Sequence, residues 1–109
     1  MNETRLEKVK SLLREAAAEF IQNESNKTSF ITVTDANVSS NLRDSIIFFT
    51  VYPEEKEAEA VNFLKRKRAP FREFAKKKLS FLRIMPRFQF EIDKGEKNRQ
   101  RIEDISKKI

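Results

Sequence analysis

The chain of 109 residues is 37% charged and 39% hydrophobic, a balance typical of one folded domain rather than of a disordered segment. Without Cys or His it has no disulfide, no thiol chemistry, and neither the commonest general base nor the commonest metal ligand. No apolar run approaches the roughly 20 residues that cross a bilayer, and the N-terminus lacks the apolar segment of a signal peptide. We therefore expect a single cytoplasmic domain over residues 1–109, and the net charge of +6 indicates a polyanionic partner.

The first predicted element is an amphipathic helix that ends at the polar run of residues 23–28. Thr4 followed by Glu7 fits a capping box, in which the two side chains satisfy free amides of the first turn. The buried side of this helix is predicted by apolar residues that recur at three- and four-residue spacing: Leu6, Val9, Leu12, Leu13, Ala16, Ala17, Phe20 and Ile21.

Two strands joined by a turn are predicted next. The segment SFITVTDANVS (29–39) is rich in β-branched residues, and SSNLRD (39–44) has Ser and Asn side chains that bond their own backbone in turns. The following SIIFFTVY (45–52) is apolar on both faces, which favours a central position in a sheet. So short a connection predicts an antiparallel hairpin. Phe48 and Phe49 fall on opposite faces of the second strand, so at least one of them must be buried.

A helix is predicted from Pro53, because proline suits a first helical position and the acidic residues after it suit the positive end of the helix dipole. The pattern then meets Pro70, which removes a helical hydrogen bond and pushes Ala69 away from helical angles. We therefore predict a helix to about Arg68, a kink, and a second helix from Pro70 to about Leu79. The expected buried positions are Ala58, Val61 and Leu64 in the first helix, and Phe71, Phe74, Ala75 and Leu79 in the second.

A third strand is predicted in MPRFQFEID (85–93), where Phe88, Phe90 and Ile92 alternate with polar residues. The predicted order is therefore helix, strand, strand, helix, kink, helix, strand, helix. A three-stranded sheet with its helices packed on one face makes an α+β domain. The closing helix, about residues 94–109, is expected to be weakly ordered, with three isoleucines on one side: Ile102, Ile105 and Ile109.

The positive charge is concentrated in KRKRAPFREFAKKK (65–78). Eight of its fourteen residues are Lys or Arg and only Glu73 is acidic, so its net charge is +7 and the rest of the chain sums to −1. A charge run is most often a solvated helix face, but this one has little local compensation and surrounds a helix break, where free amides favour a phosphate. We predict a cationic corner that contacts a nucleic-acid backbone. Phe71 and Phe74, at helical spacing, are expected in the core rather than as stacking platforms for bases.

No catalytic constellation accompanies this corner. A single glycine excludes a Gly-rich phosphate loop, and metal clusters of Cys and His are absent. Asp35, Asp44 and Asp93 could hold a metal at strand ends, but aspartates in such places are more often turn or cap residues. We expect no enzyme, no metal, no cofactor and no small-molecule substrate.

Several segments, in this order, resemble the bacterial ribosome-binding factor A family. The helix opening RLEKV (5–9) is similar to the start of that family's first helix, and VTDANVSSNL (33–42) is similar to its hairpin pattern V-T-x-V-x-V-S-x-D-L. The strand IIFFTVY (46–52), the pattern P-x-L-x-F within MPRFQF (85–90), and a closing helix with Ile102 also match. The resemblance covers nearly the whole chain.

The resemblance implies a KH-like domain of the type II arrangement, with a kinked helix pair and an Ala-x-Gly sequence in place of the usual Gly-x-x-Gly loop. This chain has Pro70 where that glycine is expected. Either residue interrupts a helix, but proline makes the stiffer kink. The resemblance further implies a non-enzymatic assembly factor that binds the immature small ribosomal subunit and its rRNA, and assists late maturation and rRNA processing.

An alternative is a protein-interaction module whose basic corner docks an acidic partner, without rRNA specificity. A membrane surface is not expected, because an interfacial helix needs an exposed bulky apolar face beside its cations. We expect a monomer. The residues expected to contact phosphates are Lys65, Arg66, Lys67, Arg68, Arg72, Lys76, Lys77 and Lys78, with Arg43, Arg83 and Arg87 extending the surface.

Overall fold

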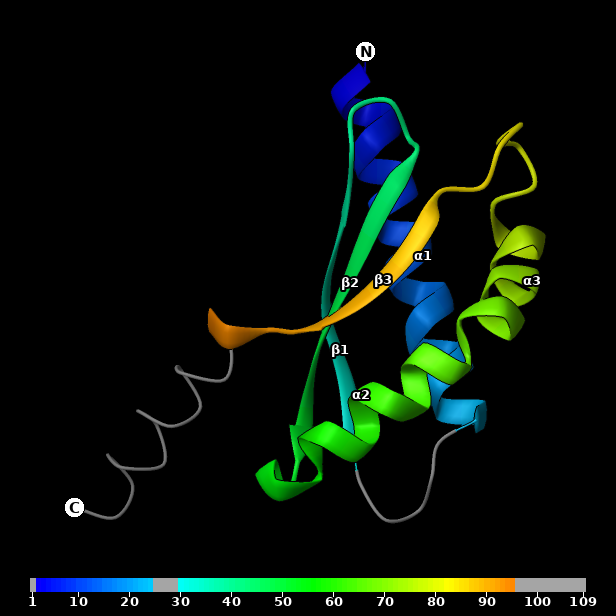
Figure 1. The fold of residues 1–109 in the computed structure, drawn as a ribbon. Helices are drawn as coiled ribbons and strands as arrows, with labels where there is room; N and C mark the ends of the chain where they lie inside the picture. Colours follow the sequence, from blue (N-terminus) through cyan, green and yellow to red (C-terminus); the bar gives the residue numbers. More distant parts are fainter. Residues whose placement is uncertain (1, 25–29, 96–109) are drawn as a thin grey trace.

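The computed structural model describes residues 2–24 and 30–95 (Figure 1). The three strands in these ranges form one sheet in the order β1-β2-β3, in which β2 is antiparallel to β1 and parallel to β3. The predicted order is confirmed up to the third strand, and the predicted closing helix lies, from residue 96 on, outside the described residues. The elements are α1 (Asn2–Glu24), β1 (Phe30–Val38), β2 (Asp44–Tyr52), the 3-10 turn η1 (Glu54–Lys56), α2 (Glu57–Arg66), α3 (Arg68–Lys78) and β3 (Arg87–Ile92).

The helices cover one face of the sheet. In Figure 1, α1 lies behind the strands and the α2–α3 pair runs beside β3. The ring of Phe71 on α3 is 5.4 Å from that of Phe20 on α1 and 4.9 Å from that of Phe88 on β3, so all three elements meet in one core. None of the described helices has the length and apolar character of a membrane span.

The strand β2 is central, as its apolar sequence predicts. It pairs with β1 along one edge and with β3 along the other. Phe49 is fully buried against the helices, whereas Phe48 is half-buried on the other face of the sheet. The alternation predicted for β3 is also confirmed, because Phe88 and Phe90 are buried and Gln89 between them is exposed.

A β-bulge in β1 keeps the apolar side chains of this strand on the helix side. Val33 pairs with Phe49 and Asp35 pairs with Phe48, so Thr34 is an extra residue in the ladder. Asp35 Oδ1 accepts a hydrogen bond of 2.8 Å from the backbone amide of Ala36. One inserted residue shifts the alternation by one position. Val33 and Ala36 therefore face the same core although they are three residues apart, a feature that no simple period predicts.

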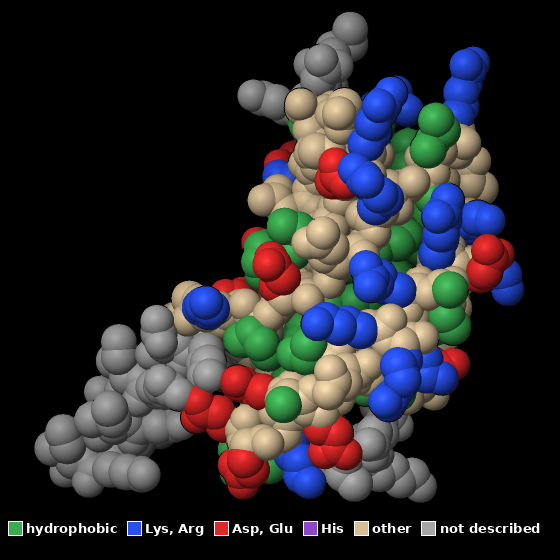
Figure 2. Space-filling model, viewed as in Figure 1, with side chains coloured by type: hydrophobic (Ala, Val, Ile, Leu, Met, Phe, Trp, Pro, Cys, Tyr) green, Lys and Arg blue, Asp and Glu red, His purple; other side chains and the backbone are tan. Residues whose placement is uncertain are grey.

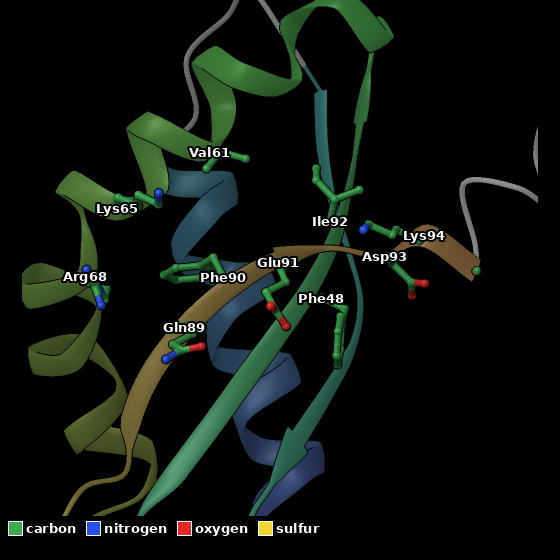
Figure 3. Close-up of a pocket in the computed structure, with 11 residues that line it drawn as sticks. Phe48, Val61, Lys65, Arg68, Gln89, Phe90, Glu91, Ile92, Asp93 and Lys94 are labelled. Atoms are coloured by element: carbon green, nitrogen blue, oxygen red, sulfur yellow. The ribbon is translucent and has the colours of Figure 1, made fainter.

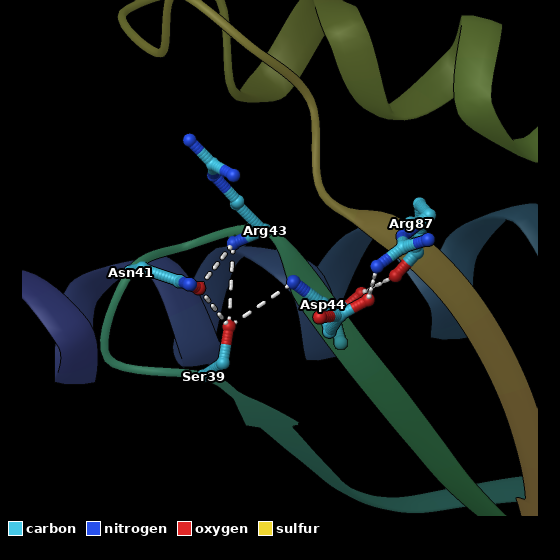
Figure 4. A network of polar contacts seen from close by, with 6 residues as sticks. Ser39, Asn41, Arg43, Asp44 and Arg87 are labelled. Carbon is cyan, nitrogen blue, oxygen red and sulfur yellow. Dashed lines mark hydrogen bonds and ion pairs between the residues drawn. The ribbon is translucent and has the colours of Figure 1, made fainter.

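The turn between β1 and β2 is built by its own side chains, as its composition predicts (Figure 4). Ser39 Oγ donates to Asn41 Oδ1 at 2.7 Å and accepts from the backbone amides of Arg43, at 3.2 Å, and Asp44, at 3.1 Å. Leu42 adopts a left-handed φ of 61°. This closed turn fixes the backbone from which the exposed Arg43 side chain projects.

The helix break lies at Lys67, not at the predicted Ala69–Pro70. The Lys67 amide donates to the carbonyl oxygens of Phe63 and Leu64, which ends α2, and its own carbonyl oxygen accepts from the Phe71 amide, which begins α3. Ala69 and Pro70 are both in the first turn of α3. The first amides of a helix have no acceptor within that helix, so a proline there removes no hydrogen bond.

Three smaller expectations are corrected. The first helix begins at Asn2, so the cap at Thr4 is wrong. Pro53 is extended and precedes η1, rather than occupying a first helical position. In α2 it is Ala60 that is buried, while Ala58 is exposed. The remaining predicted core is confirmed for the α3 side chains: Phe71, Ala75 and Leu79 are fully buried and Phe74 packs partly buried against them.

Candidate nucleic-acid interface

The cations of residues 65–78 divide between two sides of the α2–α3 pair. Residues three or four apart lie on one side of a helix. Arg68 and Arg72 accordingly lie on the side of α3 next to β3, where both line one hollow. Lys78 lies on the other side of α3, next to α1. The single basic corner predicted from the sequence is therefore two surfaces with different neighbours.

The cations next to α1 are neutralised by it. Lys67 Nζ is 3.4 Å from Glu24 and Lys78 Nζ is 2.8 Å from Glu19. These pairs tie both ends of α3 to the first helix. The sequence predicts that few of these positive charges are paired with carboxylates. For Lys67 and Lys78 that prediction is wrong, because their partners lie in α1, far away in the sequence. Within α3 itself, Lys76 pairs with Glu73 at 3.1 Å, as expected.

The Lys78–Glu19 pair has a defined pH dependence. The hydrogen bond to Glu19 and the charge of that carboxylate raise the pKa of Lys78 above its ordinary value of 10.5. A pKa that is raised on folding means that the charged lysine is favoured in the folded state. Any stability from this pair is therefore complete below the ordinary pKa and is lost only as the pH rises through the higher folded-state pKa.

A hollow of about 780 Å³ lies between the helix break and β3 (Figure 3). Lys65 of α2 and Arg68 of α3 lie on one side of it, and outward side chains of β3 lie on the other. It is open to solvent, and its floor is partly apolar. Its lining residues are Phe48, Val61, Lys65, Arg68, Gln89, Phe90, Glu91, Ile92, Asp93, Lys94 and Gly95.

A second hollow, of about 260 Å³, continues along β3 and shares Arg68 with the first. It adds Arg72 and Arg87, so three arginines line a short stretch of surface. Arg87 is held at 2.8 Å from Asp44, but its side chain remains 78% exposed. We call the two hollows together the edge groove. The cations of the edge groove are Lys65, Arg68, Arg72, Arg87 and Lys94, and its carboxylates are Glu91 and Asp93.

The predicted site residues are thus brought together only in part. Lys65, Arg68, Arg72 and Arg87 line the edge groove. Arg66 and Lys77 are exposed outside it, and Arg43 and Arg83 are exposed near the end of β3 where the strand begins. In Figure 2, Lys and Arg side chains form a row on the viewed side, over β3 and the adjoining α3. Among the described residues, seven of the predicted cations have no carboxylate within ion-pair distance: Arg43, Lys65, Arg66, Arg68, Arg72, Lys77 and Arg83.

Apart from Arg87, the part of the groove that β3 supplies was not predicted from the sequence. Gln89 and Glu91 face outward by the strand alternation, and Lys94 follows the strand. The alternation itself was the available signal, because it places these side chains opposite the apolar ones. The alternation does not predict that β3 lies next to the α2–α3 pair. That placement follows from the parallel pairing of β3 with β2.

The three aspartates considered as metal ligands have separate structural contacts. Asp35 bonds the bulge amide, Asp44 pairs with Arg87, and Asp93 accepts a hydrogen bond of 2.6 Å from the Thr34 hydroxyl. Over residues 2–24 and 30–95, no three Asp or Glu side chains are grouped as a metal site requires. Asp44 and Asp93 lie at strand ends as expected, whereas Asp35 lies within β1 beside the bulge.

Comparison with known proteins places this geometry in one family. The family model described as ribosome-binding factor A matches residues 5–106. A ribosome-binding factor A from Thermodesulfovibrio yellowstonii is 31% identical over 107 residues, which cover 96% of this chain and 90% of that protein. That name describes a binding factor rather than an enzyme, in agreement with the sequence-based expectation.

Solved structures show the same fold. The crystal structure of ribosome-binding factor A from Thermus thermophilus superimposes with a TM-score of 0.68 at 20% identity, over 80% of this chain and 94% of that one. A homology model of the T. thermophilus factor, fitted into the cryo-EM map of a 30S–RbfA complex, gives a TM-score of 0.63 at 23% identity, over 75% and 88% of the two chains. The α+β architecture is thus the KH-like, type II arrangement of those structures. By its sequence over residues 5–106, this chain belongs to the ribosome-binding factor A family.

Proposed function

We propose that this protein binds the small ribosomal subunit through its rRNA and assists the late maturation of that particle. The family description names the ribosome as partner. One structural relative was fitted into the map of a complex with the 30S subunit. A ribosomal partner also implies a cytoplasmic location, which cell fractionation would test.

The observation that carries the proposal is the row of cations along the edge groove. Lys65 and Arg68 flank the helix break, Arg72 follows one turn later, and none of the three has a carboxylate within ion-pair distance among the described residues. Arginine forks bind phosphate oxygens two at a time, and cations that release counterions from RNA supply most of the sequence-independent affinity. The groove is partly apolar as well as cationic, which suits a single strand, with its bases accessible, better than a duplex.

The salt dependence of binding tests this assignment. The triple variant with Lys65→Gln, Arg68→Gln and Arg72→Gln removes three phosphate contacts. For single-stranded RNA each contact contributes roughly 0.7 to the slope of log affinity against log salt, so the slope should fall by about two. Affinity is measured by co-sedimentation with purified small subunits and by titration of a single-stranded rRNA fragment, each at several salt concentrations.

The same stretch supplies the matched control. Lys67→Gln with Lys78→Gln also removes positive charge, but from residues that are paired with α1. This variant should lower stability slightly and leave the salt slope nearly unchanged. Equal effects of the two variants would contradict the assignment of the edge groove. Subunit binding that persists while free RNA does not bind would favour the alternative, an acidic protein partner.

A further inference from the structure

The segment between α3 and β3 exposes apolar side chains that the fold does not use. Phe81 is 46% exposed and Ile84 is 69% exposed, whereas Leu82 and Pro86 of the same segment are buried. Leu79, at the end of α3, accepts a hydrogen bond from the Leu82 amide at 3.0 Å, so the segment is a built turn. We call residues 80–85 the tip loop. Its buried members anchor it, and the exposed pair is left to meet a partner.

Cations surround this loop from three parts of the chain. Lys8 of α1 has its ammonium 5.4 Å from the centroid of the Phe81 ring. Arg83 lies in the loop itself and is exposed. The Arg87 amide, two residues after the loop, donates to the carbonyl oxygen of Arg43 at 2.8 Å, which brings the basic hairpin turn alongside. In Figure 2, hydrophobic side chains lie among Lys and Arg at the end of the row of cations.

The exposed ring and the cations around it together indicate what kind of partner the tip loop fits. An exposed aromatic ring bordered by cations attracts a group that is flat, apolar on its face, and attached to negative charge. An unpaired nucleotide has all three properties: its base stacks on aromatic rings and arginine planes, and its phosphates bind lysine and arginine.

We propose that the tip loop holds one unpaired base of the bound RNA by stacking on Phe81, with Ile84 packing beside it and Arg83 and Lys8 on the flanking phosphates. The inference rests on the proposed rRNA binding and extends it. The edge groove supplies affinity that depends on charge alone, whereas the tip loop selects single-stranded segments over duplex.

The test separates stacking from charge. Phe81→Ala should weaken binding of a single-stranded RNA by about 5- to 150-fold, the range found when one stacking platform is removed. The salt slope should stay unchanged, because no phosphate contact is lost. Binding of an RNA duplex of the same length should change little, because its bases are already stacked on each other. Phe81→Leu, which keeps apolar bulk, should lose nearly as much on the single strand.

Tyr52→Ala is the matched control. Tyr52 is another aromatic residue, 74% exposed, at the far end of β2 from the tip loop, and its removal should leave RNA binding unaffected. Circular dichroism confirms that each variant is folded. Unchanged affinity of Phe81→Ala for the single strand, or an equal loss on duplex, would overturn the proposal. So would a loss of subunit binding without a loss of RNA binding, which would indicate a protein contact. If the unaltered chain binds neither RNA nor subunit, the proposed function itself fails and this inference with it.

Discussion

The side chain of Phe71 joins the helices to the sheet. It is fully buried, and its ring packs against the rings of Phe20, Phe88 and Phe90 with centroid separations of 5.4, 4.9 and 5.7 Å. Those three rings come from α1 and β3, on either side of α3. Edge-to-face packing of this kind adds to the hydrophobic gain from burial. Phe71, inside the basic stretch, therefore helps to hold α3 and its cations beside β3.

Replacing this ring should be among the most damaging single changes in the chain. We expect Phe71→Ala to lower the free energy of unfolding by about 3–5 kcal/mol, through lost burial and the cavity left behind. Urea denaturation followed by circular dichroism measures the change. Phe71→Leu keeps most of the volume and should cost clearly less. A loss below about 1 kcal/mol for the alanine variant would contradict the tight packing around α3 that the ring contacts indicate.

For single residues, the sequence predicted which side chains are buried better than it predicted which side chains form ion pairs. Helical spacing identified Phe71 and Phe74 as core residues although they stand among eight cations, because periodicity reports which side of a helix is covered. It did not identify Lys67 and Lys78 as partners of Glu24 and Glu19. Those contacts depend on how α1 crosses α3, and no local pattern contains that information.

Among the elements, the α2–α3 junction departs most from its prediction. The sequence predicts a break at Pro70, whereas the chain turns three residues earlier, at Lys67. Proline is tolerated in a first helical turn, so Pro70 is compatible with the start of α3, and its ring would clash with the carbonyl of Arg66, the last residue of α2, if that helix continued. The glycine expected from the family resemblance is therefore not needed here for a left-handed angle, since Leu42 is the only described residue with positive φ.

The role of Pro70 can be tested against a proline placed in mid-helix. Pro70→Ala should change the free energy of unfolding by less than about 1 kcal/mol, because no hydrogen bond is gained or lost in the first turn. Glu73→Pro, at an exposed position further along α3, should cost about 3 kcal/mol or more, because it removes a helical hydrogen bond. Thermal and urea unfolding give both values. A loss of several kcal/mol from Pro70→Ala would contradict this expectation.

The bulge in β1 marks another limit of sequence reasoning at this scale. The strand was predicted within a residue of its bounds, because β-branched residues fill it. Which face of the sheet each of its side chains takes could not be predicted, because Val33 and Ala36 share a face only when Thr34 is left out of the alternation. A bulge depends on the partner strand, and the chain alone shows only an irregular pattern.

Across the whole molecule, acidic and basic side chains gather in different places along its length. In Figure 2, acidic side chains gather at the end formed by η1 and the start of α2, and cations extend over β3 and α3 toward the other end. The acidic first turn of α2, with Glu57 and Glu59, and its basic last turn, with Lys65 and Arg66, both favour the helix dipole. The excess of positive charge was predictable from composition, but its position beside β3 required the parallel pairing of β2 with β3.

We expect the whole molecule to be a monomer. Among the described residues, only three large hydrophobic side chains are exposed, and Tyr52 lies at the other end from Phe81 and Ile84. A stable dimer needs roughly 800 Å² buried on each partner, and these scattered side chains do not make a patch of that size over the described surface. Sedimentation equilibrium should therefore give a mass near 12.9 kDa at micromolar concentrations. A dimer mass at those concentrations would contradict this expectation.

The parallel strand β3 is the last of the described elements to be synthesised, so the edge groove is also completed last. Every earlier element, including all the cations of α2 and α3, leaves the ribosome before residues 87–92 do. Until β3 pairs with β2, one wall of the edge groove does not exist and Phe71 lacks two of its aromatic neighbours. A nascent chain whose β3 has not yet paired thus carries the full charge of the basic stretch without the groove that β3 completes.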